Sequence, residues 1–252
     1  VFMQIRTMIG VLALTLAFPL CGEPVRAKQY EMSQRFSHPG MKIRSNKLAN
    51  WYVLGEEVVF SSETKLPETD CVRVVMTDAD ETFWRCKGIR AKNLRLQGGT
   101  YPFMFSSDIE IDGLVSDSKY VFQYVSNVVV RNARITTKDA FWEVDNVTIY
   151  DSELNGEYLG WHSRNLRLVN CHISGEQPLC YAENLVLENC TFDPACDRAF
   201  EYSSVNATIK GSIGGVKNPR SGRIEADCLG DVVLDGNIKM PADCLLIERN
   251  KK

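Results

Sequence analysis

The chain lacks the residue spacings on which many common active sites and metal sites depend. Its 9 cysteines include no C-x-x-C pair, so neither a zinc site nor an iron–sulfur cluster has support. The G-x-S-x-G, H-E-x-x-H and P-loop patterns are absent as well. We therefore expect no metal and no cofactor, and the sequence discloses no particular reaction.

A strong excess of charge of one sign is also missing. The formal net charge is -3 over 252 residues, of which 44% are hydrophobic and 24% are charged. This composition is ordinary for a soluble globular protein of one large domain or two small ones. It gives no electrostatic reason to expect nucleic acid or anionic lipid as a partner.

The apolar run near the start of the chain, Met8–Phe18, is too short to span a bilayer. The stretch "PLCGEPVRAK" follows, in which small residues precede a cleavage point after Ala27. This layout is typical of a secretory signal peptide, residues 1–27, and predicts a secreted or periplasmic protein with no stable membrane span once it is removed. The alternative, a lipoprotein anchored through Cys21, is disfavoured by the bulky Leu20 before it.

The middle of the chain has no helical period of 3.6 residues and shows a different repeat instead. An Asn, Asp or Gly anchor is followed, one and three residues later, by apolar residues, which predicts a short half-buried strand. Five residues past the anchor a second Asn, Asp or Gly recurs, and these residue types tolerate the left-handed backbone of a bend. Eight residues past it, an apolar residue predicts a second strand. The anchors are Gly88, Asp108, Asn127, Asn146, Asn165 and Asn184, then Asn206 after a longer interval.

Self-similarity near 20 residues predicts a solenoid. A leucine-rich repeat would need its Asn one residue later than Asn170. We therefore predict an all-β fold, a single-stranded parallel β-helix with about 20 residues per coil, in which residues nineteen apart are vertical neighbours about 4.8 Å apart. Regular coils cover residues 82–213, an irregular C-terminal coil and cap covers 214–252, and residues 28–81 form an N-terminal cap or degenerate coils.

Two cysteines, Cys171 and Cys190, occupy equivalent positions in adjacent repeats, where a small apolar residue is wanted. Export would permit disulfide bridges. The repeat spacing nevertheless favours free, buried cysteines that act as small hydrophobic residues.

The segment before each anchor is rich in aromatic residues and is interpreted as a third strand. Strict alternation places the residues four and two before the anchor inside, and those five and three before it outside, whereas a local bulge would turn one of these columns inward. Four phenylalanines, here called the Phe ladder, would then point outward beside a column of charged and aromatic residues. The Phe ladder is Phe83, Phe103, Phe122 and Phe141, and the column contains Arg85, Phe105, Tyr124, Glu143, His162 and Tyr181.

This outward face has two interpretations. Large apolar patches are usually covered, which favours a loop, the N-terminal segment or a second subunit lying over it. The sharper interpretation is a groove for sugar rings, and its candidate ligand-binding residues are Arg85, Phe103, Phe105, Phe122, Tyr124, Phe141 and Tyr181.

Glu143 and His162 are the candidate catalytic pair, because a carboxylate beside an imidazole serves acid–base chemistry. A surface ion pair is the commoner role of such neighbours. Asp139 lies in a loop ahead of the same segment and adds a further carboxylate. The other histidines, His38 and His172, are interpreted as surface or packing residues.

From about Thr82 to Val233 the chain resembles the bacterial family called domain of unknown function 3737. The resemblance depends on "KDAFW", "NVTIYDS", "GEYLGW", "QPLCY", "NLVLENC" and "KNPRSGRI". It implies a pectate-lyase-like, right-handed β-helix and brings no established catalytic residues. The stretch before Thr82 departs from the family, whose members carry further coils there.

Together these features predict an exported β-helix protein that binds, or also processes, a poly- or oligosaccharide on its aromatic face. An enzyme of this kind would be a carbohydrate-active lyase or hydrolase. The alternative is a non-catalytic structural or interaction solenoid that uses the Phe ladder as a subunit interface in a homo-oligomer.

Overall fold

The computed structural model describes residues 80–235 and 243–250 in full. Before residue 80 it describes only the backbone of four short strands, which are β1 (Pro19–Leu20), β2 (Glu23–Pro24), β3 (Trp51–Gly55) and β4 (Val72–Thr77). Apart from these strands, the predicted signal peptide and the predicted N-terminal cap lie outside the described residues.

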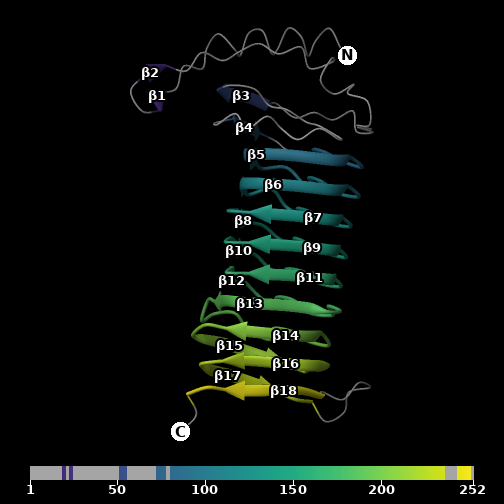
Figure 1. Cartoon of the computed structure of the whole chain (residues 1–252), viewed down its shortest axis with the longest axis vertical. Coiled ribbons are helices and arrows are strands. Elements are labelled where there is room, and N and C mark those ends of the chain that lie inside the picture. The colour runs from purple at the N-terminus through teal and green to yellow at the C-terminus, as the bar shows by residue number, and fades with distance from the viewer. Residues whose placement is uncertain are drawn as a thin grey trace.

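The described chain is a β-solenoid, as the repeat predicted. Parallel strands build about eight turns of about 19 residues each, and residues 80–235 and 243–250 contain no helix. Figure 1 shows the turns stacked along the long axis, with β5 near the N-terminal end and β18 at the C-terminal end.

Each regular turn contributes strands to two parallel stacks that meet at the predicted bend. The first stack contains β5 (Lys87–Gln97), β6 (Ser107–Ser116), β7 (Ser126–Arg131), β9 (Asp145–Tyr150), β11 (Arg164–Val169), β13 (Leu185–Phe192), β14 (Ser204–Ile209), β16 (Ser221–Ala226) and β18 (Asp243–Glu248). The strands of the second side are β8 (Arg134–Thr136), β10 (Glu153–Asn155), β12 (His172–Ser174), β15 (Ser212–Lys217) and β17 (Cys228–Val233). The longer strands β5, β6 and β13 continue through the bend and pair on both sides.

The strand register confirms that residues nineteen apart are vertical neighbours. Leu166 lies beside Val147, and Leu168 lies beside Ile149. All four side chains are buried in the interior. Stacking therefore buries the apolar face that a single coil would expose, which is why the sequence pattern repeats about every 19 residues.

The predicted bends are present, and they have the predicted left-handed backbone. The φ angles are 52° at Asn132, 49° at Asp151 and 55° at Asn170. The side chains of this row also bind one another, since the Asn170 amide donates to the Asp151 carboxylate at 2.9 Å. A second row joins the anchors, where the Asn146 amide donates to the Asn127 oxygen at 2.8 Å.

The cysteines of the repeat are buried and free, as predicted. Cys171 and Cys190 are 1% and 0% exposed, and none of the seven cysteines in the described residues forms a disulfide. Both thiols donate to main-chain carbonyl oxygens of their own or the preceding coil. They serve as small core residues, the role that the repeat position requires.

Parallel pairing extends past both ends of the predicted regular coils. Before residue 82, β4 runs parallel to β5, and β3 lies antiparallel on β4. Beyond residue 213, β16 and β18 continue the first stack and β15 pairs with β17. Much of the C-terminal segment therefore consists of further coils.

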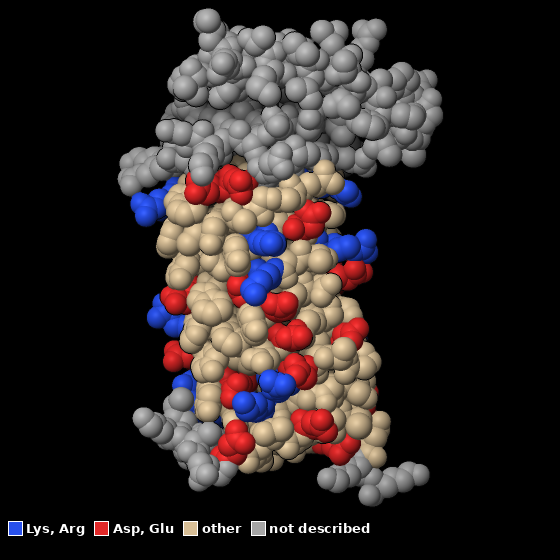
Figure 2. Space-filling view, turned by 180° about the vertical axis from the view of Figure 1, so that it is seen from behind, with Lys and Arg blue, Asp and Glu red and all other residues tan. Residues whose placement is uncertain are grey.

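The surface carries charges of both signs. Figure 2 shows blue and red residues intermingled on a largely uncharged face, with no broad area of one charge. Within the described residues, no helix is long and apolar enough to cross a membrane.

Candidate functional site

The third side of each coil is a run of turns and not the strand that alternation predicted. In these segments every second residue has a positive φ, for example 62° at Tyr120, 60° at Phe122 and 54° at Tyr124. We call this side the turn ladder. It comprises residues 80–85, 101–105, 120–124, 139–143, 158–162, 177–181 and 198–202.

Hydrogen bonds between coils continue along the turn ladder. Tyr120 and Tyr124 donate their N–H groups to the following coil, at Lys138 and Trp142, over 2.9 Å each. Phe122, between them, donates to the preceding coil at Pro102 over 3.1 Å. Because successive left-handed residues bond in opposite directions, the backbone groups are satisfied without strand geometry.

This backbone changes the direction of the side chains. In most turn segments two consecutive residues are buried and the next two are at least partly exposed, for example Ala140 and Phe141 against Trp142 and Glu143, whereas Gln123, Cys180 and Glu201 are buried. Gln123 itself is only 8% exposed. Its amide donates to the Asp139 carbonyl oxygen at 3.1 Å, which holds the side chain against the next coil. The period-two alternation of a strand therefore does not apply here.

The Phe ladder lies inside the solenoid, so the prediction that it points outward was wrong. Phe83 is 3% exposed, Phe103 and Phe122 are 0% exposed, and Phe141 is 1% exposed. Their rings stack with centroid separations of 5.1, 4.5 and 5.2 Å along the series. Phe103, Phe122 and Phe141 therefore cannot contact a surface ligand, and the Phe ladder cannot be a subunit interface.

The residues four before the anchor were predicted inside, and most of them lie on the outer side instead. Trp84, Met104, Trp142 and Trp161 are partly exposed. Trp142 stacks on Trp161 at 5.5 Å, and the Trp161 indole N–H donates to the Gln177 carbonyl oxygen at 2.7 Å. These tryptophans are residues of the outer surface that sequence reasoning placed in the interior.

The residues three before the anchor point outward, as predicted. We call them the outer column, and its members are Arg85, Phe105, Tyr124, Glu143, His162 and Tyr181. Tyr202, four residues before the anchor Asn206, lies 5.5 Å from the Tyr181 ring and continues the row. Their rings stack in two groups: Phe105 on Tyr124 at 5.0 Å, and His162 on Tyr181 at 4.8 Å. The Arg85 guanidinium lies over the Phe105 ring, 5.4 Å from its centroid.

A second row of rings runs beside the outer column. Tyr101 stacks on Tyr120 at 4.7 Å, and further along Tyr158 packs edge-on against Trp161 at 4.8 Å. We call the combined surface the outer aromatic face. It consists of Trp84, Tyr101, Phe105, Tyr120, Tyr124, Trp142, Tyr158, Trp161, His162, Tyr181 and Tyr202.

One coil interrupts both rows of rings with carboxylates. Asp139 takes the place between Tyr120 and Tyr158, and Glu143 takes the place between Tyr124 and His162. Trp142, in the same coil, stands between the two carboxylates in sequence. The outer aromatic face therefore has a polar centre with rings on either side.

The two carboxylates have different surroundings. Burial raises the pKa of Asp139, with the nearby Glu157 adding to the effect and Lys138 opposing it. One of its carboxylate oxygens is buried without a hydrogen-bond partner. Glu143 is exposed, and its side chain makes no hydrogen bond or ion pair with any residue in the described part of the chain.

The position of Glu143 leaves a gap in the outer column. Tyr124 and His162 are two coils apart, which corresponds to about 9.6 Å at the usual strand spacing. A flat ring in van der Waals contact with both flanking faces requires roughly 7 to 8 Å. We call this interruption of the ring column, where the Glu143 side chain stands between the Tyr124 and His162 rings, the Glu143 gap.

The predicted catalytic pair is brought together as vertical neighbours but not into contact. The Glu143 N–H donates to the Trp161 carbonyl oxygen at 2.9 Å, which fixes the two coils in register. His162 stacks against Tyr181 and lies 5.3 Å from the Trp142 ring, whereas Glu143 stays unpaired. A catalytic role for the pair stays a prediction.

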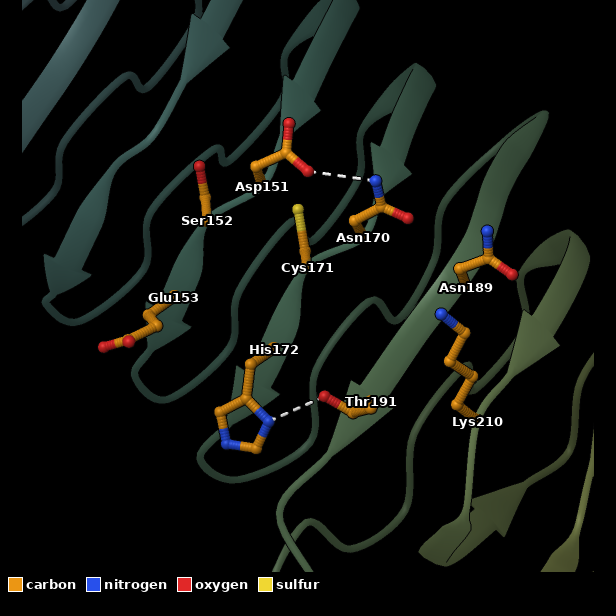
Figure 3. Close-up of a pocket in the computed structure, with 9 residues that line it drawn as sticks. All are labelled: Asp151, Ser152, Glu153, Asn170, Cys171, His172, Asn189, Thr191 and Lys210. Carbon is orange, nitrogen blue, oxygen red and sulfur yellow. Dashed lines mark hydrogen bonds between the residues drawn. The ribbon is translucent and has the colours of Figure 1, made fainter.

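A separate shallow and open cleft of about 620 Å³ lies at the bend and is lined by nine residues. Figure 3 draws these residues as sticks. His172, interpreted from sequence as a surface or packing residue, is exposed on the wall of this cleft. Its Nδ1 lies 2.9 Å from the Thr191 hydroxyl. The sequence held one indication of the cleft, the Asn and Asp residues that recur at the bend.

Neither surface offers a metal site. Within the described residues, no group of three or more His, Cys, Asp or Glu side chains is placed to hold a metal ion.

A family model described as "Protein of unknown function (DUF3737)" matches residues 63–247. The match covers more than half of the chain and begins before Thr82, so the expectation that the stretch before Thr82 departs from the family was wrong for residues 63–81. Searches of curated proteins and of solved structures gave no match.

Proposed function

We propose that this chain, which belongs to the DUF3737 family, is a carbohydrate-binding protein whose site is the outer aromatic face. The observation that carries the proposal is the Glu143 gap. There a free carboxylate stands between the exposed rings of Tyr124 and His162, beside Trp142. Sugar rings need this combination, because they present apolar C–H faces to aromatic rings and hydroxyl groups to polar side chains.

The polar groups around the gap are available to a ligand. The hydroxyl groups of Tyr124 and Tyr181 make no hydrogen bond within the described residues, and neither does the Glu143 carboxylate. Phe105 and Tyr124 are 42% and 37% exposed and stack side by side, so together they form an apolar patch on the surface. An oligosaccharide lying along the outer column would cover both.

The charge at the gap favours a sugar that carries an amine. Glu143 is negative and unpaired, and aromatic faces attract cations. The one cation of the outer column, Arg85, lies over Phe105 on the far side of Tyr124. We therefore expect glucosamine oligomers to bind more tightly than N-acetylglucosamine oligomers.

Variants of the outer column test the proposal by glycan array and calorimetry. Tyr124→Ala should weaken binding about tenfold, since one ring face contributes roughly 1 to 2 kcal/mol. Glu143→Gln should remove the preference for the amine while neutral sugars still bind. Tyr150→Ala is the matched control, because this tyrosine lies on β9 with Arg131 over its ring and should leave binding unchanged.

Absence of glycan binding, or equal losses from Tyr124→Ala and Tyr150→Ala, would overturn the proposal. A dimer in light scattering that Tyr124→Ala dissociates would instead establish the alternative, an interaction solenoid. Its interface would then be the outer aromatic face, since the Phe ladder is buried.

Processing of the sugar and export belong to the same proposal. Glu143 and Asp139 are the two carboxylates placed beside a bound sugar, and turnover of a labelled oligosaccharide that Glu143→Gln abolishes would identify a carbohydrate-active lyase or hydrolase. We include in this proposal that the solenoid is a right-handed, pectate-lyase-like β-helix. Mass spectrometry of the expressed chain, with cleavage expected after Ala27, tests export through the predicted signal peptide.

A further inference from the structure

The cleft at the bend is a second candidate site, built by different residues from those of the outer aromatic face. It is bordered on one side by the bend residues Asp151, Asn170 and Asn189, and on the other by outward residues around the second strands. The latter are Glu153, His172, Thr191 and Lys210, with Ser152 and Cys171 also in the lining. Vertical stacking places these side chains in two parallel rows (Figure 3).

Several of the lining groups already have partners. Both Glu153 oxygens accept from Arg134, at 2.7 and 3.1 Å, which neutralises this carboxylate. His172 Nδ1 is joined to Thr191 at 2.9 Å. Asn170 donates its amide nitrogen to Asp151 at 2.9 Å. These groups shape the walls of the cleft.

The groups left over gather at one end of the cleft. Lys210 forms no ion pair or hydrogen bond through its ammonium with any residue in 80–235 or 243–250. Figure 3 shows its side chain extended from its own coil towards Asn189. Asn170 turns its nitrogen to Asp151 and leaves its oxygen on the side of Asn189. The free ammonium of Lys210 and the side-chain amides of Asn189 and Asn170 therefore all border the same cleft.

We propose that this cleft binds a small hydroxycarboxylate. Lys210 and the Asn189 amide hold the carboxylate group, because an ammonium and an N–H donor are the groups that an anionic oxygen accepts from. The Asn170 oxygen accepts from a hydroxyl of the same ligand. A single cation, with the negative Asp151 further along the row, suits a monoanion better than doubly charged phosphate.

The test uses two probes that differ in one group. Gluconate and glucitol have the same chain of hydroxyls, but gluconate ends in a carboxylate where glucitol has a hydroxymethyl group. Titration of the full chain by calorimetry and by NMR of the His172 ring should show gluconate binding, with glucitol at least about tenfold weaker. Inorganic phosphate should bind more weakly than gluconate.

Two charge-neutralising variants locate the effect. Lys210→Gln should lower gluconate affinity about tenfold, whereas Lys119→Gln, which removes an exposed lysine elsewhere, should leave it unchanged. Equal affinity for the two probes, equal losses in the two variants, tighter phosphate binding or an unmoved His172 signal would each overturn the proposal. The outcome is independent of sugar binding at the outer aromatic face.

Discussion

The inward direction of the Phe ladder predicts a large difference between two phenylalanines of neighbouring coils. Phe122 is fully buried and stacks on two rings, at 4.5 Å to Phe103 and 5.2 Å to Phe141. Phe105 lies on the outer column and is 42% exposed. Changing each to alanine deletes the same atoms from opposite sides of the turn ladder.

The expected magnitudes follow from these surroundings. Buried Phe→Ala substitutions cost about 3 to 5 kcal/mol, and the loss of two stacked neighbours places Phe122→Ala near 4 kcal/mol. Phe105→Ala forfeits the stacked Tyr124 ring, the edge-on Trp84 ring and the guanidinium of Arg85 at an exposed position, which amounts to about 1 to 1.5 kcal/mol. The unfolding equilibrium constants should therefore differ by roughly a hundredfold.

Equilibrium unfolding in urea measures the difference, with tryptophan fluorescence as the probe, because Trp84 lies in the coil before Phe105 and Trp142 in the coil after Phe122. The unfolding free energy should depend on urea concentration with the same slope in both variants, because an equal slope shows that both expose the same amount of surface on unfolding. If Phe105→Ala costs as much as Phe122→Ala, the Phe ladder is not in the core. The turn-ladder geometry would then be refuted.

Three further outcomes are expected. Asn146 has a φ of 56°, so Asn146→Ala should cost about 1 to 2 kcal/mol and Asn146→Gly clearly less, as thermal unfolding of the two variants will show. Burial raises the pKa of Cys86 and Cys180 to about 12, above the ordinary value of 9.0 that applies when the chain is unfolded. The unfolding free energy should therefore fall by about 1 kcal/mol per thiol between pH 9 and pH 10, and Cys180→Ala should lose its share of that fall. Asp139→Tyr would fill the break in its row of rings and should stabilise the protein by about 1 kcal/mol while weakening sugar binding; a destabilised variant with unchanged binding would contradict this.

The solenoid was predictable because its repeat depends on residues with narrow roles. Asn and Asp at the bends report a left-handed backbone, and apolar residues at fixed offsets report the buried face. Leu166 and Val147 could be paired from spacing alone. The cysteines at Cys171 and Cys190 could be assigned to the core for the same reason.

The aromatic segment could not be predicted in the same way. Bulky residues such as Phe122 and Tyr124 seldom adopt positive φ, so their sequence favours a strand with simple alternation. The stacked coils override that preference by bonding each left-handed residue to a neighbouring coil. As a result, the sequence placed the Phe ladder outside and Trp142 and Trp161 inside, and the structure has them the other way round. Glu143 and His162 point outward, as the sequence predicted.

The coil that carries Asp139 and Glu143 shows how fold and function divide between the two sides of the turn ladder. Its inward residue, Phe141, keeps the Phe ladder continuous with Phe122, so the core of this coil is like that of its neighbours. Its outward residues depart from the aromatic rows at both places, and at Asp139 they leave a buried oxygen without a partner. An aromatic residue at either place would extend an existing stack, as Tyr120 and Tyr124 do in the coil before. The carboxylates therefore bring no gain in packing, and an unpartnered buried oxygen lowers stability. A departure from the repeat on the exposed side alone, which at Asp139 also lowers stability, is what the proposed sugar-binding site would require.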